Sequence, residues 1–174
     1  MQTKVGDLFG YVAQVNEQGQ EKGIVIAHVC NDVGGWGSGF VVPLGRAYPR
    51  AELAYRNWHK EGITEAALGG IPVEIPFELG NAQIVRGKTD GDVWVANMVA
   101  QHSTITRSPG SKPIRYAALV RCMQQVGDFC REHEKQIYCP KFGSDLAGGT
   151  WEFIAELIDE IWDGIPVTLC VLEE

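Results

Sequence analysis

The sequence has few of the features that mark three large classes of protein: paired cysteines, long apolar runs and excess positive charge. Its five cysteines form no CxxC pair, which argues against a zinc cage or a disulfide framework and favours buried thiols in a reducing compartment. No apolar run approaches the ~20 residues of a membrane span, and the first residues lack the apolar core of a signal peptide. We therefore expect a cytoplasmic protein that does not enter a membrane.

Acidic residues outnumber basic ones, 22 to 15, which gives a net charge of -7. Because sequence-independent nucleic-acid binding depends on Lys and Arg neutralising phosphates, direct binding to duplex nucleic acid is not expected. A small anionic ligand remains compatible with this charge, since backbone amides bind phosphate without formal charge. With 174 residues, 45% hydrophobic and 21% charged, the chain has an ordinary globular composition, and we expect one domain over residues 1–174.

Two common nucleotide-binding motifs are also missing. No glycine cluster is followed by the Lys of GxxxxGK[ST], so kinase or ATPase chemistry is not expected. The run Gly35-Trp36-Gly37-Ser38-Gly39 has the wrong register for GxGxxG, which makes hydride transfer with a dinucleotide a poor fit.

The pattern that is present alternates strands with helices. Apolar runs predict strands at residues 2–5, 24–29, 82–85, 93–99, 136–139 and 167–171. Apolar positions at helical spacing predict helices at residues 114–134 and 151–162, and further helices are expected at residues 40–44 and, after Pro49, at residues 51–60. This alternation indicates an α/β sandwich, with helices on both faces of a largely parallel sheet.

Two glycine-bearing loops follow predicted strands, at residues 32–39 and 142–149, and each precedes a predicted helix. Ligands of parallel sheets bind at the carboxyl ends of the strands, where both loops are expected. Glycines supply the turns, and backbone amides at a helix start suit a phosphate. Two converging loops of amides would hold a diphosphate better than one.

Five segments in this order resemble the macro domain family, a group of ADP-ribose-binding α/β modules. Gly6-Asp7-Leu8-Phe9 is similar to the early GD[IL] motif, and His28-Val29-Cys30-Asn31 stands in the place of NAAN. Residues 34–44 match the first phosphate loop, and Tyr48-Pro49 matches a YP of the yeast-type ADP-ribose-1''-phosphatase branch. Residues 139–151 resemble the second loop, MPRIGCGLxxxxW, of the branch that contains terminal ADP-ribose protein glycohydrolase.

The resemblance implies a three-layer α/β/α sandwich with a mixed, mostly parallel sheet of about six strands. It also implies ADP-ribose lying across the strand ends, with adenine by Asp7 and Leu8, the diphosphate between the loops and the distal ribose near Asn31. Neither a metal nor a cofactor is expected. The implied ligand-binding residues are Asp7, Leu8, Asn31, Gly35, Trp36, Gly37, Ser38, Gly39, Phe40, Gly143, Ser144, Asp145, Leu146, Ala147 and Gly148.

The chain departs from the family that it resembles at two catalytic positions. One hydrolase branch carries an Asp just after its glycine triplet, where this chain has Val41. The glycohydrolase branch carries an Asp in the second loop, where this chain has Ala147. Neither familiar catalytic carboxylate is therefore present.

Three other residues are candidates for catalysis: Asn31, His102 and Asp145. Asn31 either holds the distal ribose or water, or only caps a turn. His102 ends a predicted strand and suits a general acid or base near neutral pH, the alternative being an exposed loop histidine. Asp145 replaces a glycine in the amide cradle and would activate water if it faces the ribose.

Several neighbouring residues are open to a functional and a structural interpretation. We expect Trp36 to cover the diphosphate or distal ribose, because an aromatic in a glycine loop has little core to join. His28 is at least as readily a core histidine as a site residue. Arg107, Lys112 and Arg115 either contact substrate phosphate or are solvated loop charges.

Two functional hypotheses remain open. In the first, the protein binds ADP-ribose and hydrolyses a distal 1'' substituent, as an ADP-ribose-1''-phosphate phosphatase or an ADP-ribosyl hydrolase. In the second, it is a non-catalytic ADP-ribose-binding module, as the missing carboxylates suggest. The expected partners are ADP-ribose or ADP-ribose-1''-phosphate, and ADP-ribosylated macromolecules are further candidates.

Overall fold

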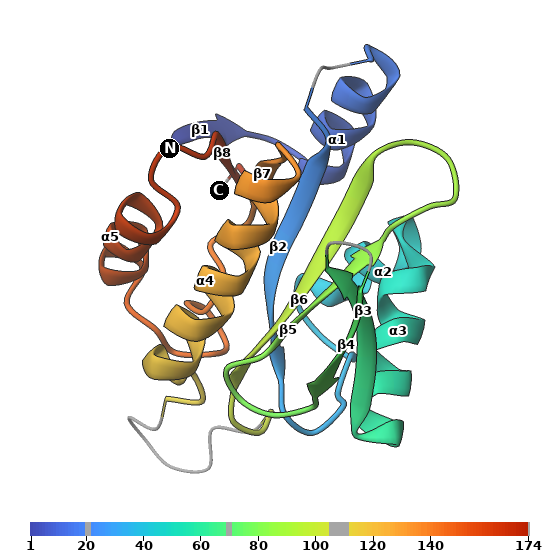
Figure 1. Ribbon diagram of the computed structural model, residues 1–174. Coiled ribbons are helices and arrows are strands. Elements are labelled where there is room, and N and C mark those ends of the chain that lie inside the picture. Colours follow the sequence, from blue (N-terminus) through green and yellow to red (C-terminus); the bar gives the residue numbers. More distant parts are fainter. Residues whose placement is uncertain (20–21, 69–70, 105–111, 174) are drawn as a thin grey trace.

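A six-stranded sheet forms the centre of the molecule, and a separate two-stranded sheet lies beside it (Figure 1). The computed structural model describes residues 1–19, 22–68, 71–104 and 112–173, with the backbone alone at 65–68 and 71–73. The strands are β1 (Gln2–Val5), β2 (Ile24–Asn31), β3 (Ile63–Leu68), β4 (Ile71–Pro76), β5 (Ala82–Arg86), β6 (Val93–Gln101), β7 (Gln136–Cys139) and β8 (Val167–Val171). The helices are α1 (Leu8–Glu17), α2 (Val41–Ala47), α3 (Pro49–Glu61), α4 (Tyr116–Glu132) and α5 (Trp151–Ile161).

The strand order of the main sheet is β1-β8-β7-β2-β6-β5. Every neighbouring pair is parallel except β5 with β6, which is antiparallel. The prediction of a mixed, mostly parallel sheet is confirmed. Because β1, β8, β7, β2 and β6 run the same way, their carboxyl ends meet at one edge, and the loops that follow them gather there.

Strand β2 contributes to two separate cores because successive side chains of a strand face opposite sides of the sheet. Ile24 and Ile26 pack with buried residues of α1, α2 and α3, whereas Val25 and Ala27 pack with those of α4 and α5. Helices α1 to α3 thus cover one face, and α4 and α5 cover the other (Figure 1). The predicted three-layer sandwich is confirmed.

Helix α1 and the strand pair β3–β4 were not predicted from the sequence. Helix α1 buries Leu8, Val12 and Val15 on one face, and the Asp7 side chain caps its first turn. The antiparallel pair β3–β4 forms its own sheet, from Ile63 opposite Pro76 onward. Gly10 lies within α1 and Pro72 lies within β4, and both residue types weaken the sequence signal for the element that contains them.

Helix α4 begins two residues later than the predicted range 114–134. Ile114 instead bridges to Gln101 of β6, and its N–H donates to the Ala147 carbonyl at 3.0 Å. The Arg115 N–H donates to the Ala100 carbonyl at 2.8 Å. The residues before α4 therefore tie the end of β6 to the loop after β7.

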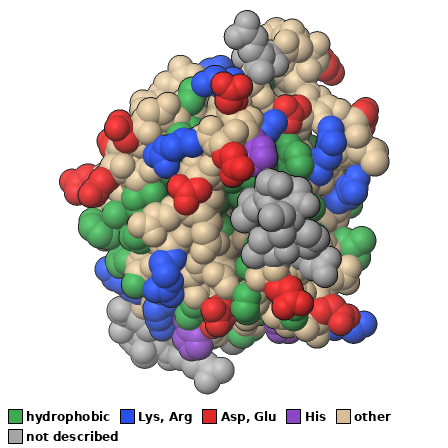
Figure 2. Space-filling view, in the orientation of Figure 1, with side chains coloured by type: hydrophobic (Ala, Val, Ile, Leu, Met, Phe, Trp, Pro, Cys, Tyr) green, Lys and Arg blue, Asp and Glu red, His purple; other side chains and the backbone are tan. Residues whose placement is uncertain are grey.

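Acidic and basic side chains are interspersed on the face shown in Figure 2. Among the described residues, no helix is both long enough and apolar enough to cross a membrane. All five cysteines are buried and free.

Candidate functional site

Two adjoining cavities open where the parallel strands end. The wide cavity, of about 480 Å³, lies beside α1 and the end of β8. The loop cavity, of about 250 Å³, lies between the two glycine-bearing loops. They share the lining residues Gly39, Phe40, Pro140, Lys141 and Asp145, so one elongated ligand can occupy both.

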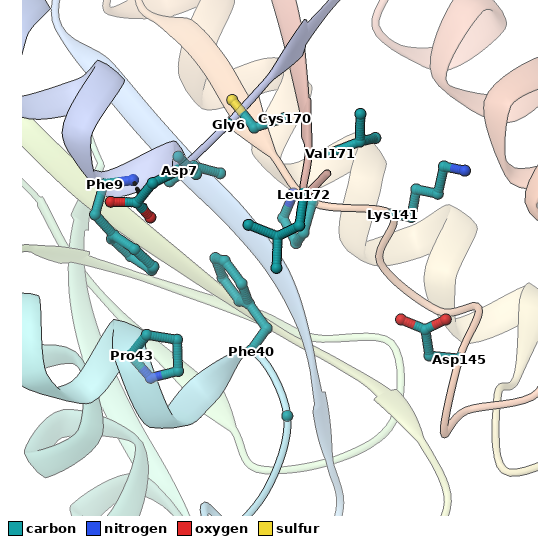
Figure 3. Close-up of a pocket in the computed structure, with 13 residues that line it drawn as sticks. Gly6, Asp7, Phe9, Phe40, Pro43, Lys141, Asp145, Cys170, Val171 and Leu172 are labelled. Carbon is teal, nitrogen blue, oxygen red and sulfur yellow. Dashed lines mark hydrogen bonds between the residues drawn. The ribbon is translucent and has the colours of Figure 1, made fainter. Parts of the chain in front are cut away.

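The wide cavity has mostly apolar walls. The rings of Phe9 and Phe40 stack with centroids 5.4 Å apart and an interplanar angle of 19°. Figure 3 shows these rings and Pro43 on one side, with Val171 and Leu172 at the end of β8 on another. A flat aromatic group with one polar edge suits such walls.

Asp7 supplies a carboxylate to the wide cavity. Its oxygens accept from the N–H groups of Gly10 at 3.1 Å and Phe9 at 3.4 Å, which caps helix α1. A carboxylate offers about four lone-pair sites, so the cap leaves capacity for a ligand amino group. Asp7 and Leu8, which the sequence predicts for adenine, both line this cavity.

The first glycine loop presents a row of backbone amides. The N–H groups of residues 37–41 donate to no acceptor among the described residues, and residues 38–41 line the loop cavity. Gly39 has a φ of 79°, which favours glycine. Amides without an intramolecular acceptor are the donors that an anion needs.

The second loop repeats this arrangement. The N–H groups of residues 143–147 also donate to no described acceptor, while those of Gly148 and Gly149 close the loop on Ser144 and Gly143 at 2.7 and 2.8 Å. The φ angles of Gly143 and Gly148 are 74° and 75°. A Cβ on Gly149 would lie 2.2 Å from the Gly143 carbonyl oxygen, so the closure requires glycine.

The loop cavity lacks the two carboxylates of related hydrolases. Val41 and Ala147, which stand at those positions, both line it with apolar side chains. Among the described residues, the carboxylate that lines the loop cavity is that of Asp145, which also lines the wide cavity (Figure 3). Leu146 approaches the opposite loop, with Cδ1 3.8 Å from a Cβ built on Gly39.

Asn31 organises the first loop from beneath. Its Oδ1 accepts from the N–H groups of Val33 and Gly35 at 3.0 and 2.9 Å and from the Tyr55 hydroxyl at 2.9 Å. Its Nδ2 donates to the Gly35 carbonyl at 2.9 Å. Asn31 lines neither cavity, so its described contacts are those of a residue that shapes the loop.

Trp36 differs from its predicted place. The expectation that it has little core to join is wrong, because the side chain is 5% exposed and packs against Tyr55 and His28. Its Nε1 has no hydrogen-bond partner among the described residues. Trp36 therefore anchors the glycine loop to the core beneath α2 and α3 and lines neither cavity.

His28 is a core histidine that borders the loop cavity. Its Nε2 hydrogen-bonds to Asn97 Oδ1, and Asn97 donates to Gln83 Oε1 at 3.1 Å. Burial lowers the pKa of His28 from 6.5 to about 4, against the opposing effect of the Asn97 bond. The ring is therefore neutral at physiological pH.

A histidine and a carboxylate meet at the ends of β6 and β2. His102 Nδ1 lies 2.7 Å from Asp32 Oδ2, and the Ser103 N–H donates to Asp32 Oδ1 at 2.8 Å. Partial burial raises the pKa of the Asp32 carboxyl, but the bonds from Ser103 and His102 outweigh it, and the net pKa is lowered. Asp32 and His102 line neither cavity, whereas Gln101, the neighbour of His102, lines the loop cavity.

Gly35, Gly37 and Gly148 belong to the loops but line neither cavity, and Lys112 also lines neither. Arg107 lies outside the described residues. Arg115 Nη1 donates to the carbonyls before α4, which is a structural contact. Sequence reasoning missed the lining residues Gly6, Phe9, Val29, Pro43, Gln101, Pro140, Lys141, Phe142, Cys170, Val171 and Leu172.

These features define an α/β/α domain with a ligand cleft built from loop amides. No protein-family model matches the chain. A curated relative, the ADP-ribose 1''-phosphate phosphatase of Lodderomyces elongisporus, is 41% identical in an alignment that covers 97% of this chain and 96% of that protein.

Solved structures point to the same class. A macrodomain protein from Streptomyces coelicolor is 38% identical, with a TM-score of 0.70 over 98% of this chain and 97% of that one. A protein of unknown function from Bacteroides thetaiotaomicron is 34% identical, with a TM-score of 0.79 over 98% and 97% of the two chains. The chain belongs to the macrodomain family.

The buried His28 predicts a pH-dependent loss of stability. The unfolded chain binds a proton at this residue below pH 6.5, whereas the folded chain does so only below about pH 4. Between pH 7.5 and pH 4, wild type should therefore lose about 3 kcal/mol more unfolding free energy than His28→Gln. Urea titrations across this range measure the difference. The exposed variant His133→Gln should track wild type, and parallel curves for wild type and His28→Gln would refute the assignment.

Proposed function

We propose that this macrodomain binds ADP-ribose and hydrolyses ADP-ribose-1''-phosphate to ADP-ribose and phosphate. The observation that carries the proposal is the pair of facing loops, residues 37–41 and 143–147, whose amides have no acceptor among the described residues. The phosphatase from Lodderomyces elongisporus, at 41% identity, supports the choice of substrate.

The two cavities suggest how the ligand lies. Adenine would enter the wide cavity against Phe9 and Phe40, with its amino group on Asp7. The diphosphate oxygens would accept hydrogen bonds from the amides of the two loops. Reorganising these amides would cost little free energy, because the loops are already closed. The distal ribose would extend into the loop cavity, on the side of the Asn31 turn.

Three residues would serve the reaction. Asn31 would hold the first loop in the shape that the distal ribose contacts. His102 would accept a proton from the attacking water, and the general-base role suits an imidazole near neutral pH. Asp145, whose carboxylate reaches both cavities, would bind ribose hydroxyls, because a carboxylate against the diphosphate would be repelled.

The second candidate function is an ADP-ribose-binding module without turnover. The apolar lining by Val41 and Ala147 favours it, since neither side chain can activate water. Under either function, ADP-ribosylated macromolecules are candidate partners through the same cleft. We place the protein in the cytoplasm as a single domain, in keeping with its free, buried cysteines.

The first test is release of phosphate from ADP-ribose-1''-phosphate in water labelled with ¹⁸O. We expect turnover, with the label appearing in the phosphate, because water would attack phosphorus and not the ribose carbon. Mass spectrometry of the released phosphate gives the answer. Binding of ADP-ribose by calorimetry without turnover would contradict the phosphatase and leave the binding module. No heat at millimolar ADP-ribose would contradict both.

The second test places a side chain in the first loop. A Cβ on Gly37 meets no atom within 4 Å, and Gly37 is not among the residues with positive φ. Gly37→Val should therefore fold normally but weaken ADP-ribose binding at least about tenfold, or 1.4 kcal/mol, because a β-branched side chain restricts the loop backbone that aims the amides of residues 37–41 at the diphosphate. Leu53→Phe, which adds as many carbon atoms on the exposed face of α3, is the matched control. Equal affinity in both variants would show that this loop is not the cradle.

A further inference from the structure

The ends of β2 and β6 bring a carboxylate and a histidine together beyond the sheet. The two strands pair in parallel, with a register shift between Cys30 and Asn31 that sets Asn31 opposite Gln101. The residues that follow, Asp32 and His102, consequently leave the sheet side by side. We call them the Asp32–His102 pair.

The Asp32 carboxylate is held through both of its oxygens. Oδ2 lies 2.7 Å from His102 Nδ1, and Oδ1 accepts from the Ser103 N–H at 2.8 Å. The Asp32 N–H itself donates to the Gln101 carbonyl at 2.9 Å. The carboxylate can therefore neither turn away from the ring nor move along the strand without breaking a bond.

The histidine backbone is equally constrained. The His102 N–H donates to the Pro113 carbonyl at 2.8 Å. Ser103 has a φ of 64°, which residues other than glycine seldom adopt, and its carbonyl accepts from Gln101 Nε2 at 2.8 Å. These contacts fix the position from which the imidazole projects.

The ring is anchored at one nitrogen and open at the other. The Asp32 side chain is 18% exposed and the His102 side chain 56% exposed. Since an ionised carboxylate only accepts hydrogen bonds, Nδ1 must carry the hydrogen that Asp32 receives. In the neutral imidazole Nε2 then holds the lone pair, and no described group bonds to it.

We infer that Asp32 is a positioning residue for His102: it fixes the tautomer in which Nε2 is the base. The inference rests on the proposed phosphatase function.

In the reaction, Nε2 of His102 takes a proton from water as the water oxygen bonds to phosphorus. The bond from phosphorus to the 1'' oxygen breaks, and that oxygen receives the proton back from the imidazolium. ADP-ribose and hydrogen phosphate leave, and the imidazole is neutral again. A carboxylate that orients a histidine in this way recurs on unrelated hydrolase folds.

The informative variant is Asp32→Asn. Its Oδ1 can still accept from the Ser103 N–H, so the loop keeps that bond. Its amide group would donate to Nδ1 and favour the opposite tautomer, in which Nε2 carries the hydrogen and cannot act as a base. We expect kcat for ADP-ribose-1''-phosphate to fall about 100-fold, with KM and ADP-ribose affinity within a few-fold of wild type. Asp128→Asn, on the exposed face of α4, is the matched control.

A spectroscopic readout separates orientation from mere structural support. ¹⁵N-edited NMR of the histidine rings, with His102 assigned from His102→Gln, should show the Nδ1–H tautomer in wild type and Nε2–H in Asp32→Asn. Wild-type kcat in Asp32→Asn, or an unchanged tautomer, would overturn the inference and leave the phosphatase in place. Failure of the wild-type protein to release phosphate would overturn the phosphatase and, with it, any catalytic role of the pair.

Discussion

The structure depends on backbone amides that the fold leaves without partners at one edge of the sheet. Residues 37–41 and 143–147 follow β2 and β7, two parallel neighbours whose carboxyl ends point to the same edge of the sheet. An amide without an acceptor is costly when buried away from water, so these loops are stable where they border a cavity open to solvent or ligand. The same constraint explains why glycines occupy the turns of these loops and why side chains packed beneath them hold the loops in place.

The first loop is held in place mostly by side chains whose positions the sequence alone does not reveal. Trp36 was expected over the ligand, yet it fills the core beneath the first loop. Asn31 accepts a hydrogen bond from the Gly35 N–H of the loop, and the Tyr55 hydroxyl donates to Asn31. Nothing local to Trp36 reveals the space left between β2 and α3, because tertiary packing creates it.

The sequence was most informative where local patterns decide structure. The apolar runs predicted the six strands of the main sheet, and the glycines located both loops. Leu172 was missed because its place in the wide cavity depends on β8 pairing with β1, a contact between the two ends of the chain. The Asp32–His102 pair was missed for the same reason: it joins residues 70 positions apart.

The central claim is that the loop amides form one anion cradle for ADP-ribose. The most direct measurement is a titration of ¹⁵N-labelled protein with ADP-ribose, followed by amide NMR. The account predicts the largest shifts at residues 37–41 and 143–147, together with Gly10 and Phe9 at the Asp7 cap. Saturable shifts confined to other parts of the chain, or none at millimolar ligand, would contradict it.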